Sequence, residues 1–305
     1  MLRPGLRCGL LIVVSGFVSA AYAQSILVGR IVRADMQKTP YVEWFDRQYS
    51  GYQPASAVVD KLKVPLATVS VEAYFGTWCG DSRRQIPRLL RLLDAVGYDE
   101  ARLTMTGLSD RSMEFKKAPG NPEAKRLIHR TPTIVVLRDG AEIGRIVETP
   151  ETSLEADLLA IVEGRGPAPK YGAEGWIHRL FTERTAAEAE KVLESAGPEI
   201  LKRSDPDSLW HYAEYDLLRN GRAREARAVL DLHLKLNPRS VVGHVLLSDA
   251  LVSLGRPVEA LAAVERALAI EPSNTRAQRA AEKLRRPQPS GGGVMASVSG
   301  PASSS

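Results

Sequence analysis

Apolar and polar residues alternate over residues 69–75 (VSVEAYF), with an apolar side chain at every second position. This period of two is typical of a β-strand with one buried face. From residue 80 onward the period changes, since Ile86, Leu89 and Leu93 are spaced as on one face of a helix. Gly76 lies in the break between the two patterns, and Gly97 ends the second pattern. The stretch therefore predicts a strand, a turn and a helix, in that order.

Comparable patterns predict the other elements of the first half of the chain. Asp139-Gly140 is typical of a two-residue hairpin turn. The turn-rich segment 116–122 (KKAPGNP) is expected to be a solvated connection, with a place beside Cys79 as the alternative. Helices between parallel strands, followed by a terminal hairpin, indicate an α/β domain. We expect strands at 25–33, 103–108, 134–137 and 142–147, and helices at 41–49, 57–62 and 154–162.

A sequence repeat marks the second half of the chain. Six positions recur 34 residues later: Trp210, Leu217, Gly221, Ala226, Leu230 and Pro238 correspond to His244, Leu251, Gly255, Ala260, Val264 and Pro272. The period, the small residues where paired helices would cross, and the prolines that end each pair resemble tetratricopeptide (TPR) repeats. The resemblance implies an all-α array with repeats at about 207–240 and 241–274. Because about three repeats are needed for stability, helices at 176–203 and 275–286 are expected to cover the ends.

The TPR resemblance also implies a concave face that binds a peptide or a partner protein. In the repeat register this face would carry Ser208, His211, Tyr215, Arg219, Val245 and Asp249. The alternative is that the array packs mainly against its own domain.

The composition is that of a folded protein of two domains, with 305 residues, 44% hydrophobic and 25% charged. The net charge of +5 is spread along the chain without a basic run interleaved with aromatic residues, so we expect no nucleic-acid partner. Residues 1–23 resemble a secretory signal, with Arg3 and Arg7 before an apolar core and an A-x-A sequence at the end. We therefore expect an exported, periplasmic or secreted protein, with an uncleaved anchor as the alternative. No later segment is apolar enough to span a membrane.

Cys79 is the one cysteine that remains when the expected signal, which contains Cys8, is removed. A single thiol cannot close an internal disulfide. Cys79 lies at the start of the predicted helix, where unpaired backbone N–H groups and the positive end of the helix dipole favour the thiolate over the thiol. Such a cysteine is either buried and inert or reactive toward an external partner, and its position at the helix start favours the reactive alternative.

The segment Trp78-Cys79-Gly80-Asp81-Ser82, after a strand and before a helix, is similar to the active-site segment of the thioredoxin superfamily. Pro87 matches the proline inside that family's active-site helix, and Arg130-Thr131-Pro132-Thr133 resembles the family's cis-proline strand. The resemblance implies an α/β thioredoxin-like fold with a central mixed sheet flanked by helices. It also implies that Pro132 is cis and lies beside Cys79, and that the backbone of Thr131 pairs with a substrate chain.

Two positions depart from the thioredoxin pattern. Ser82 replaces the second cysteine, so no thiol within the chain can release Cys79 from a mixed disulfide. The Ser82 hydroxyl can still donate a hydrogen bond to the Cys79 thiolate. Ala73 stands where many thioredoxins carry a buried acid. These departures favour monothiol exchange with a protein or a low-molecular-weight thiol or disulfide, with Trp78, Cys79 and Ser82 as the catalytic candidates.

Two functions remain open on the sequence alone. The first is monothiol exchange by Cys79, with the TPR region recruiting a partner protein. The second is a non-enzymatic binding protein whose thioredoxin fold has lost redox turnover. We expect His129 to be a surface histidine, with an acid–base partner of the thiol as the alternative. The other histidines lack metal-ligand spacing, so we propose no metal site and no cofactor.

Glycine and proline are frequent in residues 163–175, which indicates a domain boundary. Residues 287–305 contain few bulky apolar side chains and are expected to be disordered. The expected organisation is a signal at 1–23, a thioredoxin-like domain at 24–165, a linker at 166–175, a TPR-like helical domain at 176–286 and a tail at 287–305.

Overall fold

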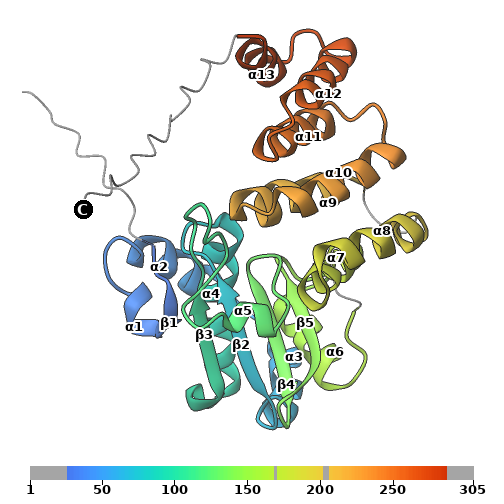
Figure 1. The fold of residues 1–305 in the computed structure, drawn as a ribbon. Coiled ribbons are helices and arrows are strands. Elements are labelled where there is room, and N and C mark those ends of the chain that lie inside the picture. Colours follow the sequence, from blue (N-terminus) through green and yellow to red (C-terminus); the bar gives the residue numbers. More distant parts are fainter. Residues whose placement is uncertain (1–25, 168–169, 202–205, 287–305) are drawn as a thin grey trace, which may run out of the picture.

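The structure is a computed structural model that describes residues 26–167, 170–201 and 206–286 (Figure 1). The expected signal at 1–23 and the expected tail at 287–305 lie outside the described residues. Within the described ranges, no helix combines the length and the apolar character needed to cross a membrane.

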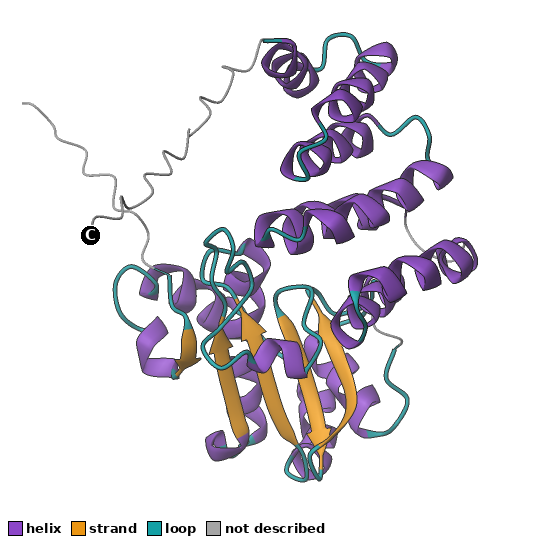
Figure 2. Ribbon diagram, in the orientation of Figure 1, coloured by secondary structure: helices purple, strands orange, loops and turns teal. Residues whose placement is uncertain are grey.

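Five strands form one mixed sheet, shown in orange in Figure 2, in the order β1-β3-β2-β4-β5. Only β2 and β3 are parallel, and the other neighbouring strands pair antiparallel. The first strand is shorter than the expected range 25–33. It pairs antiparallel to its neighbour, whereas the sequence predicted parallel strands joined by helices. The direction of an edge strand depends on tertiary pairing, which the hydrophobic pattern does not encode. The strands are β1 (Gly29–Ile31), β2 (Ser70–Phe75), β3 (Leu103–Gly107), β4 (Thr133–Arg138) and β5 (Ala141–Val147).

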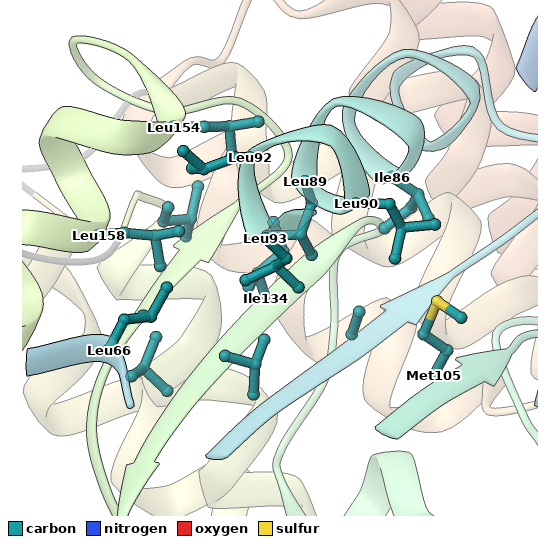
Figure 3. Packing of buried hydrophobic residues seen from close by; sticks show 14 of the residues in the cluster. Leu66, Ile86, Leu89, Leu90, Leu92, Leu93, Met105, Ile134, Leu154 and Leu158 are labelled. Carbon is teal, nitrogen blue, oxygen red and sulfur yellow. The ribbon is translucent and has the colours of Figure 1, made fainter. Parts of the chain in front are cut away.

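The large core of the first half lies between one face of this sheet and four helices. Alternate residues of β2, from Val71 to Phe75, point into this core, as the period of two predicts. Figure 3 shows Leu89 and Leu93 of the long helix near Ile134 of β4. These helices are α2 (Val42–Gly51), α3 (Ser56–Leu66), α4 (Gly80–Val96) and α6 (Leu154–Val162). The first half of the chain also contains the short helices α1 (Arg33–Met36) and η1 (Glu100–Arg102).

A smaller apolar cluster lies on the opposite face of the sheet. Val135 and Leu137 of β4 point into it, whereas their neighbours Ile134 and Val136 face the large core. The segment between β3 and β4, which includes α5 (Pro122–Lys125), covers this second face (Figure 2). Because β4 is covered on both faces, its four residues from Ile134 to Leu137 are all apolar rather than alternating.

The expectation of a solvated connection at 116–122 is wrong at its first residues. Lys116 and Ala118 are buried, as is the preceding Phe115. Ala118 belongs to the small cluster on the second sheet face. The burial of the charged Lys116 depends on a partner from the second half of the chain, Asp216, which the local composition of the segment cannot indicate.

Two predicted turns are confirmed. Helix α4 ends at Gly97, which adopts a left-handed conformation with φ of 71° and terminates the helix. Asp139 and Gly140 connect β4 to β5 with φ values of 53° and 79°. Positive φ at both central residues is the requirement of the type I′ hairpin turn.

The second half of the described chain consists of helices (Figure 1). The first, α7 (Gly172–Glu183), begins inside the expected linker. The expected repeats at 207–240 and 241–274 fall on two successive helix pairs, and a π-helical segment interrupts the first of them. The further elements are α8 (Ala186–Leu201), α9 (Pro206–Tyr212), the π-helical η2 (Ala213–Leu217), η3 (Leu218–Asn220), α10 (Ala223–Leu236), α11 (Val241–Ser253), α12 (Pro257–Ile270) and α13 (Thr275–Arg285).

Candidate functional site

Cys79 is the N-cap residue of α4, where the chain leaves β2 through the turn at Gly76. Its backbone is extended, and its thiol donates a hydrogen bond from Sγ to the carbonyl oxygen of Thr131 at 3.3 Å. The side chain is partly exposed, and its thiol is free. The sulfur therefore lies at the positive end of a helix dipole and remains open to a reactant on one side.

Ser82 lies one turn into α4 and is almost fully buried. Its hydroxyl accepts a hydrogen bond from the backbone N–H of Gly76 at 3.2 Å, and it lies 3.4 Å from Oγ1 of Thr131. These contacts differ from the expected hydrogen bond to Cys79. Ser82 thus joins the turn before α4 to the segment before Pro132, while the thiol of Cys79 is directed to the carbonyl of Thr131.

Trp78 forms one wall of this site. Its Nε1 donates a hydrogen bond to the carbonyl oxygen of Leu108 at 2.9 Å, and its ring centroid lies 5.0 Å from that of Phe115. A Cβ atom at Gly76 would lie only 2.4 Å from Cε2 of Trp78. Glycine at position 76 therefore permits the indole to lie close over the turn.

Thr131 and Pro132 lie beside the thiol, as the sequence resemblance implied. The peptide bond between them is cis, so that expectation is confirmed. Thr131 is buried, and the carbonyl oxygen of Pro132 accepts a hydrogen bond from the backbone N–H of Glu148 at 2.7 Å. The structure thus brings Trp78, Cys79 and Ser82 together with Thr131 and Pro132, although 52 residues separate Cys79 from Thr131.

Three expected partner-binding residues of the first repeat contact their own chain instead of an open groove. Tyr215 packs 6.0 Å from the ring of Phe115, and the guanidinium of Arg219 lies 4.0 Å from the same ring. His211 packs against Tyr215 at 4.5 Å. The alternative that the array packs against its own domain therefore holds for this part of the first repeat.

The expected residues outside that contact occupy different environments. Ser208 and Val245 are buried, and Val245 belongs to the apolar cluster of the last helices. Asp249 of α11 accepts a hydrogen bond from Arg276 of α13 at 2.9 Å. Asp249 thus lies at the surface, where it connects α11 to α13.

The segment that covers the first repeat is residues 109–118, which we call the docked loop. The carbonyl oxygen of Arg219 accepts a hydrogen bond from the backbone N–H of Met113 at 2.6 Å. Arg219 also donates from Nη2 to the carbonyl oxygen of Asp110 at 3.1 Å, and Asn220 donates to the carbonyl oxygen of Phe115 at 3.1 Å. The helical region thus holds the docked loop through its backbone as well as through the side chains of Phe115 and Lys116.

Two buried ion pairs connect the helical region to the residues before Pro132. Nζ of Lys116 lies 2.9 Å from Asp216 of η2 and donates to the carbonyl oxygen of His129 at 2.7 Å. Nη2 of Arg130 lies 2.6 Å from Glu174 of α7. The side chains of the first pair are each 7% exposed, and those of the second are 6% and 0% exposed. Both contacts are thus removed from solvent screening.

Burial and charge act in opposite directions on these groups. Burial raises the pKa of both acids, although Lys116 opposes the shift at Asp216 and Arg130 opposes it at Glu174. Burial disfavours the charged Arg130, but the hydrogen bond and charge of Glu174 raise its pKa above the ordinary value. Sequence patterns missed these pairs because about a hundred residues separate Lys116 from Asp216 and no local period relates them.

The expectation of a surface position for His129 is wrong. Its side chain is buried, and its ring packs 5.7 Å from that of His178. Burial, together with the charges of nearby groups, lowers the pKa of His129 well below its usual value. Its Nδ1 lies 3.4 Å from the carbonyl oxygen of Leu127. A neutral imidazole in this environment fits a structural contact between the two halves better than an acid–base role.

The comparisons with known proteins bear on the second half of the chain. A family model described as Tetratricopeptide repeat matches residues 217–284, from η2 through α13. No curated protein and no solved structure matches the chain. Among the described residues, no group of three or more His, Cys, Asp or Glu side chains is arranged to hold a metal ion. The match supports the TPR part of the expected organisation and, with it, a role in protein–protein interaction.

Proposed function

We propose that this chain is an exported protein in which a thioredoxin-like domain uses Cys79 for monothiol disulfide exchange and the TPR region binds a protein partner. The observation that supports the exchange is the position of Cys79: a partly exposed thiol at the N-terminus of a long helix, 3.3 Å from the carbonyl of the residue before a proline. The strand order and the helix after β2 agree with this fold. Export rests on residues 1–23 of the sequence.

The chemistry requires a thiol from outside the chain. The Cys79 thiolate attacks one sulfur of a partner disulfide, that S–S bond breaks, and the departing thiolate takes a proton from water. Cys79 is then held in a mixed disulfide. The thiolate of a protein or low-molecular-weight thiol attacks the partner's sulfur in that bond and releases the Cys79 thiolate. In the first step Cys79 is oxidised and the departing sulfur is reduced to a thiol. In the second step Cys79 is restored, and the external thiol takes the place of the departed one in a disulfide with the partner, so the net reaction is an exchange of thiols.

The contact between Cys79 and Thr131 suggests how a substrate chain is received. In the thiol form, Cys79 donates a hydrogen bond to the Thr131 carbonyl oxygen. A thiolate has no proton to donate, so deprotonation leaves this oxygen without its donor. A backbone N–H of an extended substrate then supplies the missing hydrogen bond. The deprotonation that forms the Cys79 nucleophile thus also frees the Thr131 carbonyl oxygen to accept a hydrogen bond from the substrate.

The partner-binding role belongs to the surface that the chain itself leaves open. Residues of the first repeat at Tyr215 and Arg219 already hold the docked loop. Asp249 and Glu214 are bridged by Arg276, which joins η2, α11 and α13 at the surface. We place the partner-binding surface at this later part of the array.

The test of the exchange reaction uses the full chain with Cys8→Ser, in which Cys79 is the single thiol. The protein is mixed with an activated pyridyl disulfide, and the released pyridinethione and the protein mass are measured. We expect one equivalent released per chain and the corresponding mixed disulfide, with release of Cys79 only after a small thiol is added. Cys79→Ala is the matched control and is expected to be inert.

A non-enzymatic binding protein is the second candidate, favoured by the engagement of Ser82 with Gly76 and Thr131 rather than with the sulfur. In that case the native chain releases no pyridinethione, while the unfolded chain releases one equivalent. This outcome would overturn the exchange proposal, because it would identify Cys79 as an inert structural thiol.

A further inference from the structure

The two buried ion pairs hold two consecutive residues, His129 and Arg130, close to the thiol. Lys116, fixed by Asp216, donates to the carbonyl of His129. Arg130, the next residue, is fixed by Glu174. The residue after that, Thr131, supplies the carbonyl that accepts from Cys79. The helical region thus holds residues 129 and 130 immediately before the atom that faces the sulfur.

Stability alone does not account for these pairs. Removing two charges from water costs several kcal/mol per ion, and well-packed apolar residues of similar volume often stabilise a protein as well or better. A buried ion pair does, however, fix the relative position of the two segments that carry it, because each charged group must lie next to its partner. Glu174 meets Arg130 with both carboxylate oxygens, at 2.8 and 2.6 Å, which is a bidentate contact with defined orientation.

The other wall of the site is held by the same region. Phe115, which precedes Lys116, packs against Trp78 on one side and lies beneath Arg219 on the other. The docked loop therefore carries two adjacent residues, of which Phe115 contacts Trp78 and Lys116 contacts the backbone of His129. Its position is set by the helical region through the backbone contacts of Arg219 and Asn220.

We propose that Asp216 and Glu174 are positioning residues of the thiol site, which hold residues 129–131 in the geometry needed to receive an extended polypeptide disulfide. This inference rests on the proposed function, since it concerns the substrate of the same site. It assigns the helical region a part in the exchange reaction besides partner binding. It also selects the substrate class: a chain long enough to pair with the Thr131 backbone, rather than a small disulfide that meets only the sulfur.

The test replaces one pair by apolar residues, Lys116→Met with Asp216→Leu, in the full chain with Cys8→Ser. This change removes both charges together, so no unpaired charge is left buried, and it also removes the donor to the His129 carbonyl. Two pyridyl disulfides with the same leaving group are compared: one on an extended peptide and one on N-acetylcysteine. Arg224→Ala is the matched control, because it breaks an ion pair with Glu190 at the surface of the helical region.

We expect the double variant to keep a cooperative thermal transition and to react with the peptide disulfide about tenfold more slowly than the parent chain. Its rate with the N-acetylcysteine disulfide is expected to stay within about twofold. Arg224→Ala should match the parent chain with both reagents. Loss of the peptide preference in a folded variant is an effect that a merely structural pair would not produce.

A folded double variant that keeps the parent chain's rates with both reagents would overturn the positioning role and leave the exchange proposal intact. A parent chain that reacts with neither reagent would overturn the exchange proposal and, with it, the positioning role. If the double variant fails to fold, Glu174→Gln tests the other pair. The amide keeps the shape of the carboxylate and an oxygen that accepts a hydrogen bond from Arg130, while Glu148 remains near the Arg130 charge. Unchanged rates in that variant would also overturn the inference.

Discussion

His178 illustrates at the residue scale how the interface between the two halves depends on protonation. Its Nδ1 lies 3.0 Å from the hydroxyl of Tyr212, and its ring packs against His129. Burial, with smaller effects of nearby positive charges, lowers the pKa of His178 to about 3. The imidazole therefore stays neutral in the folded protein at pH values where an exposed histidine is protonated.

We predict that His178→Gln makes the stability of the protein less dependent on pH. Between about pH 6.5 and about pH 3 the unfolded chain binds a proton at His178 and the folded chain does not. The free energy of unfolding therefore falls as the pH decreases below about 6.5, by at most about 1.4 kcal/mol per pH unit for this group. Glutamine retains a hydrogen-bonding group for Tyr212 and does not titrate.

The measurement is urea unfolding of both proteins at about pH 7 and about pH 5. Burial raises the pKa of Glu174 and Asp216, so these acids act in the opposite direction, but they are present in both proteins and largely cancel. We expect a smaller loss of stability on acidification in the variant. Equal losses would show that the side chain at 178 is accessible to protons in the folded state.

At the scale of elements, the end of α4 is determined by one residue. Gly97 has φ of 71°, and a Cβ atom added there would contact nothing within 4 Å. The cost of a side chain at this position is therefore conformational and not steric. Since α4 carries Cys79 at its other end, this C-terminal cap contributes to the stability of the element that bears the thiol.

We predict that Gly97→Ala lowers the free energy of unfolding by about 1 kcal/mol, because alanine is strained at positive φ. Gly51→Ala is the matched control. Gly51 also has open space around its Cα, but it lies within α2 without a positive φ. Alanine there is expected to be neutral or slightly stabilising. Chemical denaturation of the two variants checks this contrast, and equal effects would contradict it.

The sequence is sufficient to predict elements where the signal is local. The helix after Cys79, its end at Gly97 and the hairpin at Asp139-Gly140 follow from periodicity and turn chemistry, and the structure contains all three. The direction of β1 and the burial of the docked loop do not follow. The loop is polar in composition, and the burial of Lys116 depends on two partners outside the loop, the carboxylate of Asp216 and the carbonyl oxygen of His129.

The same reasoning explains which parts of the candidate site could be found. Trp78, Cys79 and Pro132 carry a recognisable motif. The carboxylates of Glu174 and Asp216 do not, because acidic residues in helices are usually solvated. Tyr215 and Arg219 were expected on a face that binds a partner protein, but both contact the docked loop of the same chain, which the sequence could not indicate.

At the scale of the whole molecule, buried ion pairs join the sheet region to the helical region. Arg130 of the sheet region meets Glu174 of α7, whose side chain is fully buried. Removing one member of such a pair leaves the other without compensation, which typically costs about 3–5 kcal/mol. Ion pairs at the surface of the helical array contribute far less, because water and salt screen them.

We therefore predict that Arg130→Met lowers the free energy of unfolding by about 3 kcal/mol or more. Arg256→Met, which removes an exposed ion pair with Glu259, is expected to cost less than about 1 kcal/mol. Thermal or chemical unfolding of the two variants gives the comparison. A similar small cost for both would mean that Glu174 is protonated or hydrated in the folded state of the Arg130 variant.

Helical repeat regions are often regarded as interchangeable modules, but in this chain the buried cations Lys116 and Arg130 each pair with a carboxylate of the helical region, Asp216 and Glu174. Another array grafted onto the same sheet would enclose both cations without the carboxylates of Asp216 and Glu174. Such a chimera would leave Arg130, which cannot give up its charge, with Glu148 as its remaining carboxylate. Lys116 would lose its carboxylate, so the chimera would have to expose the interface or deprotonate Lys116. Exchange of modules by recombination is therefore restricted at this junction to arrays that bring both acids in the same places.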